Sequence, residues 1–86
     1  MAHFAKISSS GRVETVIVVS NVDCGDLEFP ESESIGQAFI ANTLRLDGEW
    51  LQTSYNNNFR GIYGGEGYSY DSINDVFVAP PMIYPA

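Results

Sequence analysis

The chain has 86 residues, and its four Lys or Arg and eleven Asp or Glu give a net charge of −7. This length predicts one small domain with a limited hydrophobic core, and the single cysteine, Cys24, rules out an internal disulfide that could reinforce it. The acidic balance argues against nucleic-acid binding, because Lys and Arg side chains supply most of the affinity for phosphate backbones.

The N-terminal sequence, MAHFAKISSSG, has neither a basic leader nor a long apolar run, so no signal peptide is expected. The longest apolar stretch, residues 16–19, is too short to span a membrane. We therefore expect a protein made in a cytoplasm, with no membrane partner. A lone free cysteine is consistent with a reducing compartment.

The first elements predict a β-hairpin. Residues 3–7 have the pattern of a short strand, residues 8–11 that of a turn, and residues 13–19 that of a strand rich in β-branched side chains. The second strand is almost wholly apolar from Val16 onward. We therefore expect it at the centre of the sheet, with both faces covered.

One helix is predicted at residues 34–43, after a loop at residues 21–30. Ser34 and Gln37 have the spacing of a capping box, in which each side chain binds a backbone amide at the helix start. The acidic residues expected near the positive end of the helix dipole are Glu31 and Glu33. The apolar residues at helical spacing are Ile35, Ala38 and Phe39.

The remainder has a pattern of short strands and turns. The expected strands are residues 49–55, 59–63, 68–70 and 76–78. The predicted fold is a small α+β domain over residues 1–79, an antiparallel β-meander with the helix packed on it. The Pro- and aromatic-rich tail at residues 80–86 is expected to run extended across a surface, because proline lacks an amide donor.

The glycine-rich sequence at residues 64–67, GGEG, does not fit a phosphate-binding loop. It precedes a strand pattern and carries Glu66 where such a loop would carry a cation. A turn with positive backbone angles explains it better. The nearby tyrosines could stack on single-stranded nucleic acid, but only Arg60 accompanies them, so packing or a protein interface is favoured.

No metal, cofactor or catalytic site is predicted. The segment from Asp71 to Asp75 fails the calcium-loop pattern, because Ile73 stands where a ligand is needed, so Asp71 is expected to form an Asx turn. His3 and Cys24 could in principle form a base and nucleophile. However, the acids that flank Cys24 would raise the pKa of its thiol and make it less reactive.

Two long stretches resemble a family of short proteins from tailed phages of marine cyanobacteria and other marine bacteria. These stretches are VIVVSNVDCGDLEFPESESIGQAFIA and WLQTSYNNNFRGIYGGEGYSYDSINDVFVAP, at residues 16–41 and 50–80. Family members typically open with MAHFAK or similar, carry a DCGDLEFPE-type loop, and continue with WxQTSYN and RxxYxGxGYxYD segments. The tail, APPMIYPA, departs from the PYPSW form of the family, whose members often extend further. The resemblance implies a viral setting, in the virion or the host cytoplasm, and assigns no catalytic or binding residue.

We therefore expect a non-enzymatic phage protein that acts by protein–protein contact, as a minor structural or decoration component of the virion. Its expected partners are further copies of itself or other phage structural proteins. Two alternatives remain open: an early modulator that binds a host protein, and a small β-rich oligomer that binds nucleic acid. The residues predicted as core or interface anchors are Trp50, Tyr63, Tyr68, Phe77 and Tyr84.

Overall fold

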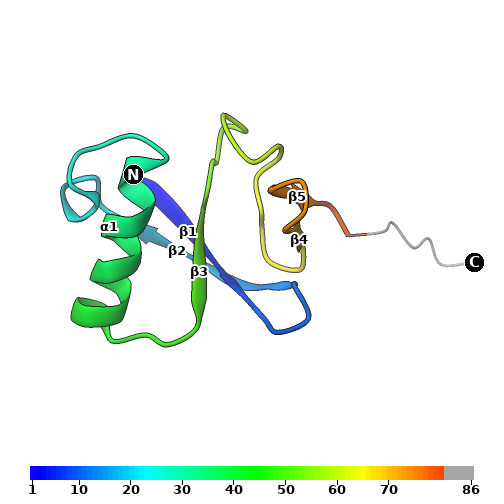
Figure 1. Cartoon of the computed structure of the whole chain (residues 1–86), viewed down its shortest axis with the longest axis horizontal. Helices are drawn as coiled ribbons and strands as arrows, with labels where there is room; N and C mark the ends of the chain where they lie inside the picture. The colour runs from blue at the N-terminus through cyan, green and yellow to red at the C-terminus, as the bar shows by residue number, and fades with distance from the viewer. Residues whose placement is uncertain (81–86) are drawn as a thin grey trace, which may run out of the picture.

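The computed structural model describes residues 1–80, which form two antiparallel sheets and one α-helix (Figure 1). The strands are β1 (Ala2–Ile7), β2 (Val13–Val19), β3 (Glu49–Thr53), β4 (Ser69–Asp71) and β5 (Val76–Val78). The helix α1 (Glu31–Phe39) continues into a π-helical turn, Ile40–Leu44, and a 3-10 turn, Val22–Cys24, follows β2. The predicted α+β class, with antiparallel strands and a short helix, is confirmed.

The larger sheet has the order β2-β1-β3, and β4 pairs with β5 in the smaller one. β1 is therefore the central strand, and the prediction that residues 13–19 would be central is wrong. Although β2 is an edge strand, it is apolar because both faces of the sheet are covered. Ile17 and Val19 pack on the side of α1, whereas Val16 packs on the side of the β4–β5 hairpin.

Side chains of β1 alternate between two hydrophobic cores, one on each face of the sheet. The helix-side core contains Ala2, Phe4, Val19, Cys24, Ile40 and Trp50. The hairpin-side core contains Ala5, Ile7, Val13 and Phe77. Figure 1 shows this layering, with α1 on the left of the sheet and β4–β5 on the right. The two faces of the sheet are thus covered by different elements.

The helix starts earlier than the sequence pattern predicts. It begins at Glu31, directly after Pro30, and no side chain caps its first turn. Ser34 is exposed, and the side chain of Gln37 donates to the C=O of Trp50 at 2.5 Å. The predicted capping box is therefore wrong, because Gln37 binds β3 instead of the helix start.

The buried face of the helix is also rotated from the predicted one. Ile35 and Ala38 are exposed, although Phe39 packs on the helix-side core. The buried positions are Ser32, Gly36 and Ile40. At Gly36 a Cβ atom would overlap the ring of Phe4, so glycine is needed for the helix to lie this close to β1.

Residues 59–63 were predicted as a strand, and they form a loop instead. Arg60 has a φ of 55°, which is outside the strand region. The segment pairs with β5 through one isolated bridge, from Gly61 to Phe77. The glycine-rich sequence at residues 64–67 is a turn, as predicted, with Gly67 at a φ of 88°. The next strands, β4 and β5, lie within one residue of their predicted positions.

Candidate interaction site

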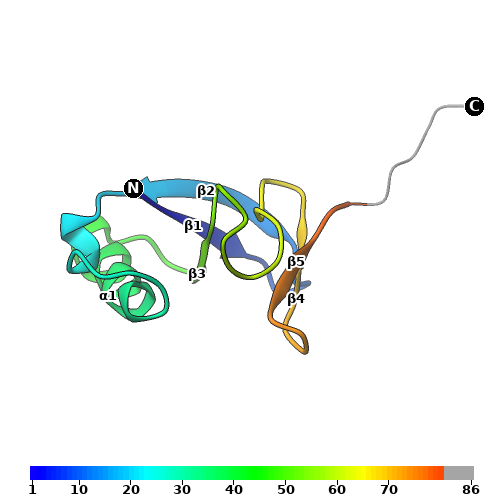
Figure 2. The same cartoon turned by 90° about the horizontal axis from the view of Figure 1, so that it is seen from above.

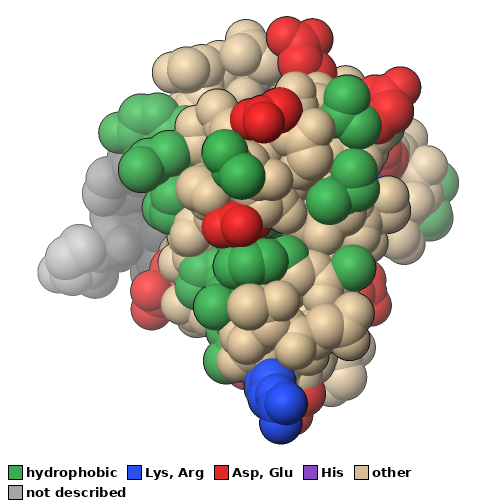
Figure 3. Space-filling model, turned by 90° about the vertical axis from the view of Figure 1, so that its left-hand side faces the viewer, with side chains coloured by type: hydrophobic (Ala, Val, Ile, Leu, Met, Phe, Trp, Pro, Cys, Tyr) green, Lys and Arg blue, Asp and Glu red, His purple; other side chains and the backbone are tan. Residues whose placement is uncertain are grey.

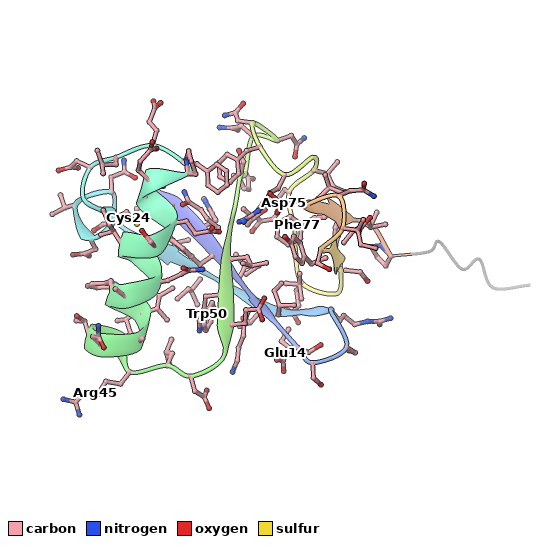
Figure 4. The ribbon with its side chains drawn as sticks, viewed as in Figure 1. Glu14, Cys24, Arg45, Trp50, Asp75 and Phe77 are labelled. Atoms are coloured by element: carbon pink, nitrogen blue, oxygen red, sulfur yellow. The ribbon has the colours of Figure 1, made fainter. Side chains whose placement is uncertain are left out.

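Two of the predicted anchors, Trp50 and Phe77, lie in the cores and are only 6% and 3% exposed. The indole N–H of Trp50 donates to the C=O of Asp47 at 3.0 Å, which satisfies its polar atom. Phe77 packs against the ring of Tyr70, with 5.4 Å between ring centres. Figure 4 places these two labelled side chains on opposite sides of β3. Both residues therefore hold the fold together.

The other predicted anchors lie in different surroundings. Tyr68 is half-buried against the hairpin-side core, and Tyr63 is half-buried in a cluster of three rings. Tyr84 lies outside the described residues. Of these tyrosines, Tyr63 is the one that adjoins a strongly exposed ring.

The ring cluster consists of His3, Tyr55 and Tyr63. His3 stacks on Tyr55 with 5.4 Å between ring centres, and Tyr63 meets both rings edge-on at 5.9 Å and 5.4 Å. Tyr55 is 68% exposed. Burial lowers the pKa of His3 and raises that of Tyr63, so both rings favour their neutral forms. The sequence did not single out Tyr55, because its partners come from distant parts of the chain.

A hollow lies beside this cluster, around the N-terminal end of β1. It comprises a cavity of about 660 Å³ and an adjoining one of about 480 Å³, both lined by Met1, Gln52 and Phe59. We call it the N-terminal hollow. The strongly exposed apolar side chains in or beside its walls are Met1, Val22, Leu27 and Tyr55, which are 82%, 72%, 52% and 68% exposed. Exposed apolar side chains of this size can mark contact sites, although the exposed lining of the larger cavity is mainly polar.

The outer edge of β3 binds side chains from α1 and from the loop that follows β3. The N–H of Gln52 donates to Glu33 Oε2 at 2.8 Å, and the C=O of Gln52 accepts from Arg60 Nη1 at 2.9 Å. The C=O of Trp50 accepts from Gln37, as described above. Side chains thus occupy the positions that a further strand would need in order to pair with β3.

Arg60 is the centre of this network. Its guanidinium pairs with Glu33 through both Nη atoms, and its Nε donates to Asp75 Oδ1 at 2.8 Å. The side chains of Arg60 and Glu33 are only 9% and 17% exposed. Asp75 Oδ1 also accepts from the hydroxyl of Tyr70 at 2.5 Å. The network therefore ties α1, β3 and the β4–β5 hairpin together.

The charges in the network stabilise one another. Burial opposes the charged form of Arg60, but hydrogen bonds to Glu33 and Asp75 outweigh it and raise the pKa. Hydrogen bonds from Tyr70 and Arg60 lower the pKa of Asp75. Burial and the hydrogen bond to Asp75 raise the pKa of Tyr70 to about 12. These pKa shifts favour the charged guanidinium of Arg60, the ionised carboxylate of Asp75 and the neutral phenol of Tyr70 at neutral pH.

The predicted Asx turn at Asp71 is confirmed. Its Oδ1 accepts from the N–H of Ile73 at 3.0 Å, and its Oδ2 accepts from the side-chain amide of Asn74 at 2.8 Å. These hydrogen bonds, chiefly those from Asn74, lower the pKa of Asp71. The carboxylate therefore fixes the turn that joins β4 to β5.

His3 and Cys24 lie on opposite faces of the sheet. Cys24 is 1% exposed in the helix-side core, and His3 packs in the ring cluster on the other face. Burial and the carboxylate of Asp23 raise the pKa of the thiol. Within residues 1–80, no three His, Cys, Asp or Glu side chains gather where they could hold a metal ion. The same residues include no helix with the length and apolar character to cross a membrane.

Comparisons with known proteins give no relative for this chain. No model of a protein family matches it, and neither a curated protein nor a solved structure does.

Proposed function

We propose that this chain is a non-enzymatic phage protein that acts by protein–protein contact, as a minor structural or decoration component of the virion. The resemblance of residues 16–41 and 50–80 to short proteins of marine tailed phages supports the phage setting. The exposed apolar side chains around the N-terminal hollow support the mode of action, and this is the observation on which the proposal rests.

Several polar and reactive side chains of the described residues are engaged inside the fold. Arg60, Glu33, Asp75 and Tyr70 bind one another, and the thiol of Cys24 is buried with a raised pKa. In contrast, large apolar side chains face solvent at the N-terminal hollow. A surface with exposed apolar side chains is suited to binding a partner.

The partner is expected to present an apolar side chain flanked by basic ones. Tyr55 and Met1 belong to residue types that are enriched at protein interfaces. Asp26 and Glu28 line the same hollow and are exposed. Exposed apolar side chains beside carboxylates complement a basic, partly apolar surface of another particle protein.

The test is mass spectrometry of purified phage particles. The protein should be present in many copies per particle, and its absence from particles would contradict the proposal. Tyr55→Ala should lower incorporation several-fold, because it removes the most exposed ring of the hollow. The matched control is Ile73→Ala, since Ile73 is 91% exposed but lies in the β4–β5 turn. Equal loss of incorporation in both variants would contradict a role of the N-terminal hollow in binding the particle.

A second candidate function is the binding of a host protein early in infection. Three exposed carboxylates, Asp26, Glu28 and Glu31, lie within six residues beside the N-terminal hollow. Figure 3 shows acidic side chains spread over the face of α1, with hydrophobic side chains between them. Such a face could occupy a basic groove. Capture of a basic host protein that is lost at high salt, together with absence from particles, would favour this function.

The nucleic-acid alternative is less well supported. Arg60 is the one cation that the sequence places near the tyrosines, and its side chain is engaged by Glu33 and Asp75. Lys6 Nζ lies 3.5 Å from Asp47 Oδ1 and forms an ion pair with it. Among residues 1–80, Arg12 and Arg45 are the Arg or Lys side chains outside these ion pairs. Retention of RNA or single-stranded DNA on a filter at low salt would revive this alternative.

A further inference from the structure

Strand β2 forms an open edge of the larger sheet. Figure 2 shows β2 along the upper margin of the molecule, with β1 on its inner side. Within the described part of the chain, the outer side of its first residue is covered, since Val13 donates to the C=O of Tyr68 at 2.7 Å and accepts from the N–H of Gly67 at 3.0 Å. Among residues 1–80, no further main-chain partner lies on the outer side of residues 14–19.

The register shows which groups of this edge are free. Gln52 directs its N–H and C=O away from β1, toward Glu33 and Arg60. Phe4, which faces Gln52, must therefore direct its own groups toward β2, where it faces Ile17. By alternation, the N–H and C=O groups of Val16 and Val18 point outward from the sheet.

The free edge is apolar and has no feature that blocks pairing. Residues 15–19 are TVIVV, with neither a charge nor a proline. Val18 is 52% exposed. Edge strands are normally protected by lysines, prolines or a covering element, so an open and β-branched edge favours the addition of another strand.

We propose that β2 pairs antiparallel with β2 of a second copy of this chain, about a two-fold axis at Ile17. In this register Val16 faces Val18 of the second copy, and the reverse pair follows by symmetry. The larger sheet then becomes continuous across the dimer. No charged pair lies within the paired segment, and Glu14 faces the neutral Ser20 of the second copy.

The second copy fits this edge for two reasons. An antiparallel arrangement places the uncharged residues 15–19 of the two copies against each other, so no like charges face each other within the paired segment. In addition, side chains already occupy the outer edge of β3, so β2 is the open edge of the larger sheet among residues 1–80. Pairing through that edge closes after two copies and does not continue into a fibre.

The inference does not depend on a role in the particle. It is tested by the solution mass of the full chain, measured by light scattering across a concentration series. The expected mass is twice that of one chain. Val18→Lys should raise the dissociation constant at least about tenfold, because a lysine on the edge opposes strand addition. The matched control, Val78→Lys, changes a strand valine that is 47% exposed in β5 and should leave the dimer intact.

Amide hydrogen exchange of the wild-type protein tests the same pairing and does not depend on whether the Val18→Lys variant folds. The N–H groups of Val16 and Val18 should be protected in the wild-type dimer and should exchange faster on dilution to the monomer. A monomer at all concentrations, a larger oligomer, or a dimer in which these amides exchange freely would each overturn the inference. A monomeric protein that is still found in particles would leave the proposed function standing.

Discussion

The two edges of the larger sheet differ in what lies against them. At β3, the outward groups of Trp50 and Gln52 bind side chains of Gln37, Glu33 and Arg60. At β2, the outward groups of residues 16–18 meet no main-chain partner among residues 1–80. The difference follows from the order of the elements, since α1 directly precedes β3 and the Arg60 loop directly follows it. The β3 edge is therefore protected by tertiary contacts, whereas the β2 edge has neither such contacts nor a blocking residue at positions 15–19.

The outer edge of β3, which we call the closed edge, contains a largely buried ion pair. Arg60 and Glu33 are largely buried, and the removal of charges from water is unfavourable unless each charge is fully paired. All the nitrogens of the guanidinium have partners, so this condition is met at Arg60. The network therefore matters most when one member is removed, because the others are then left unpaired.

The largest expected effect is that of Arg60→Ala. The change leaves the carboxylate of Glu33 and the C=O of Gln52 without their partner in a largely buried place. Breaking such a pair should lower the free energy of unfolding by about 3 kcal/mol. Urea denaturation followed by circular dichroism measures this difference.

The control for Arg60→Ala is Arg45→Ala, which removes an exposed cation at the end of the π-helical turn. This variant should stay within about 0.5 kcal/mol of the wild type. A double variant, Arg60→Met with Glu33→Leu, should recover much of the lost stability, because it removes both charges. If Arg60→Ala were no less stable than Arg45→Ala, the closed edge would not depend on the ion pair.

A smaller effect is expected for Gln37→Ala. The change removes the donor to the C=O of Trp50 and should destabilise the fold by about 1 kcal/mol. Ser34→Ala is the matched control within the same helix, since Ser34 is exposed and caps nothing. It should stay within about 0.5 kcal/mol of the wild type. If Ser34→Ala lowered the free energy of unfolding by about 1 kcal/mol, Ser34 would cap the helix as the sequence predicts.

The sequence was sufficient for features that depend on local pattern. The alternation of residues 3–7, the β-branched run of residues 13–19 and the turn signals around Asp71 predicted their elements correctly. The predictions were wrong where a polar side chain binds a residue that is distant in the sequence. Gln37 has the spacing of a helix cap but binds Trp50, which is 13 residues away.

The anchors show the same limit. The size of the aromatic rings was enough to identify Trp50 and Phe77, which are buried in the cores. Tyr55 was missed, because its importance comes from His3, which the pairing of β1 with β3 brings to its side. The predicted strand at residues 59–63 failed for a related reason. Arg60 turns inward to reach Glu33, which is 27 residues away.

The smallest expected effect concerns the outer end of the network, at Tyr70. Its pKa is raised to about 12 by burial and by the hydrogen bond to Asp75, against about 10 in an unfolded chain. Its contribution to stability is therefore complete below about pH 10 and is lost as the pH rises toward about 12, because the unfolded chain releases its proton first. Tyr70→Phe should lower the free energy of unfolding by less than about 1 kcal/mol at neutral pH, since Asp75 is 55% exposed.

The same variant should flatten the fall in stability over that alkaline range, as measured by urea denaturation at several pH values. Asp75→Asn provides the control, because it keeps the burial of Tyr70 but removes the carboxylate that opposes ionisation. Its alkaline fall in stability should lie between those of the wild type and Tyr70→Phe. If Tyr70→Phe left this fall unchanged, the phenol would not be part of the network, and the closed edge would end at Arg60 and Asp75.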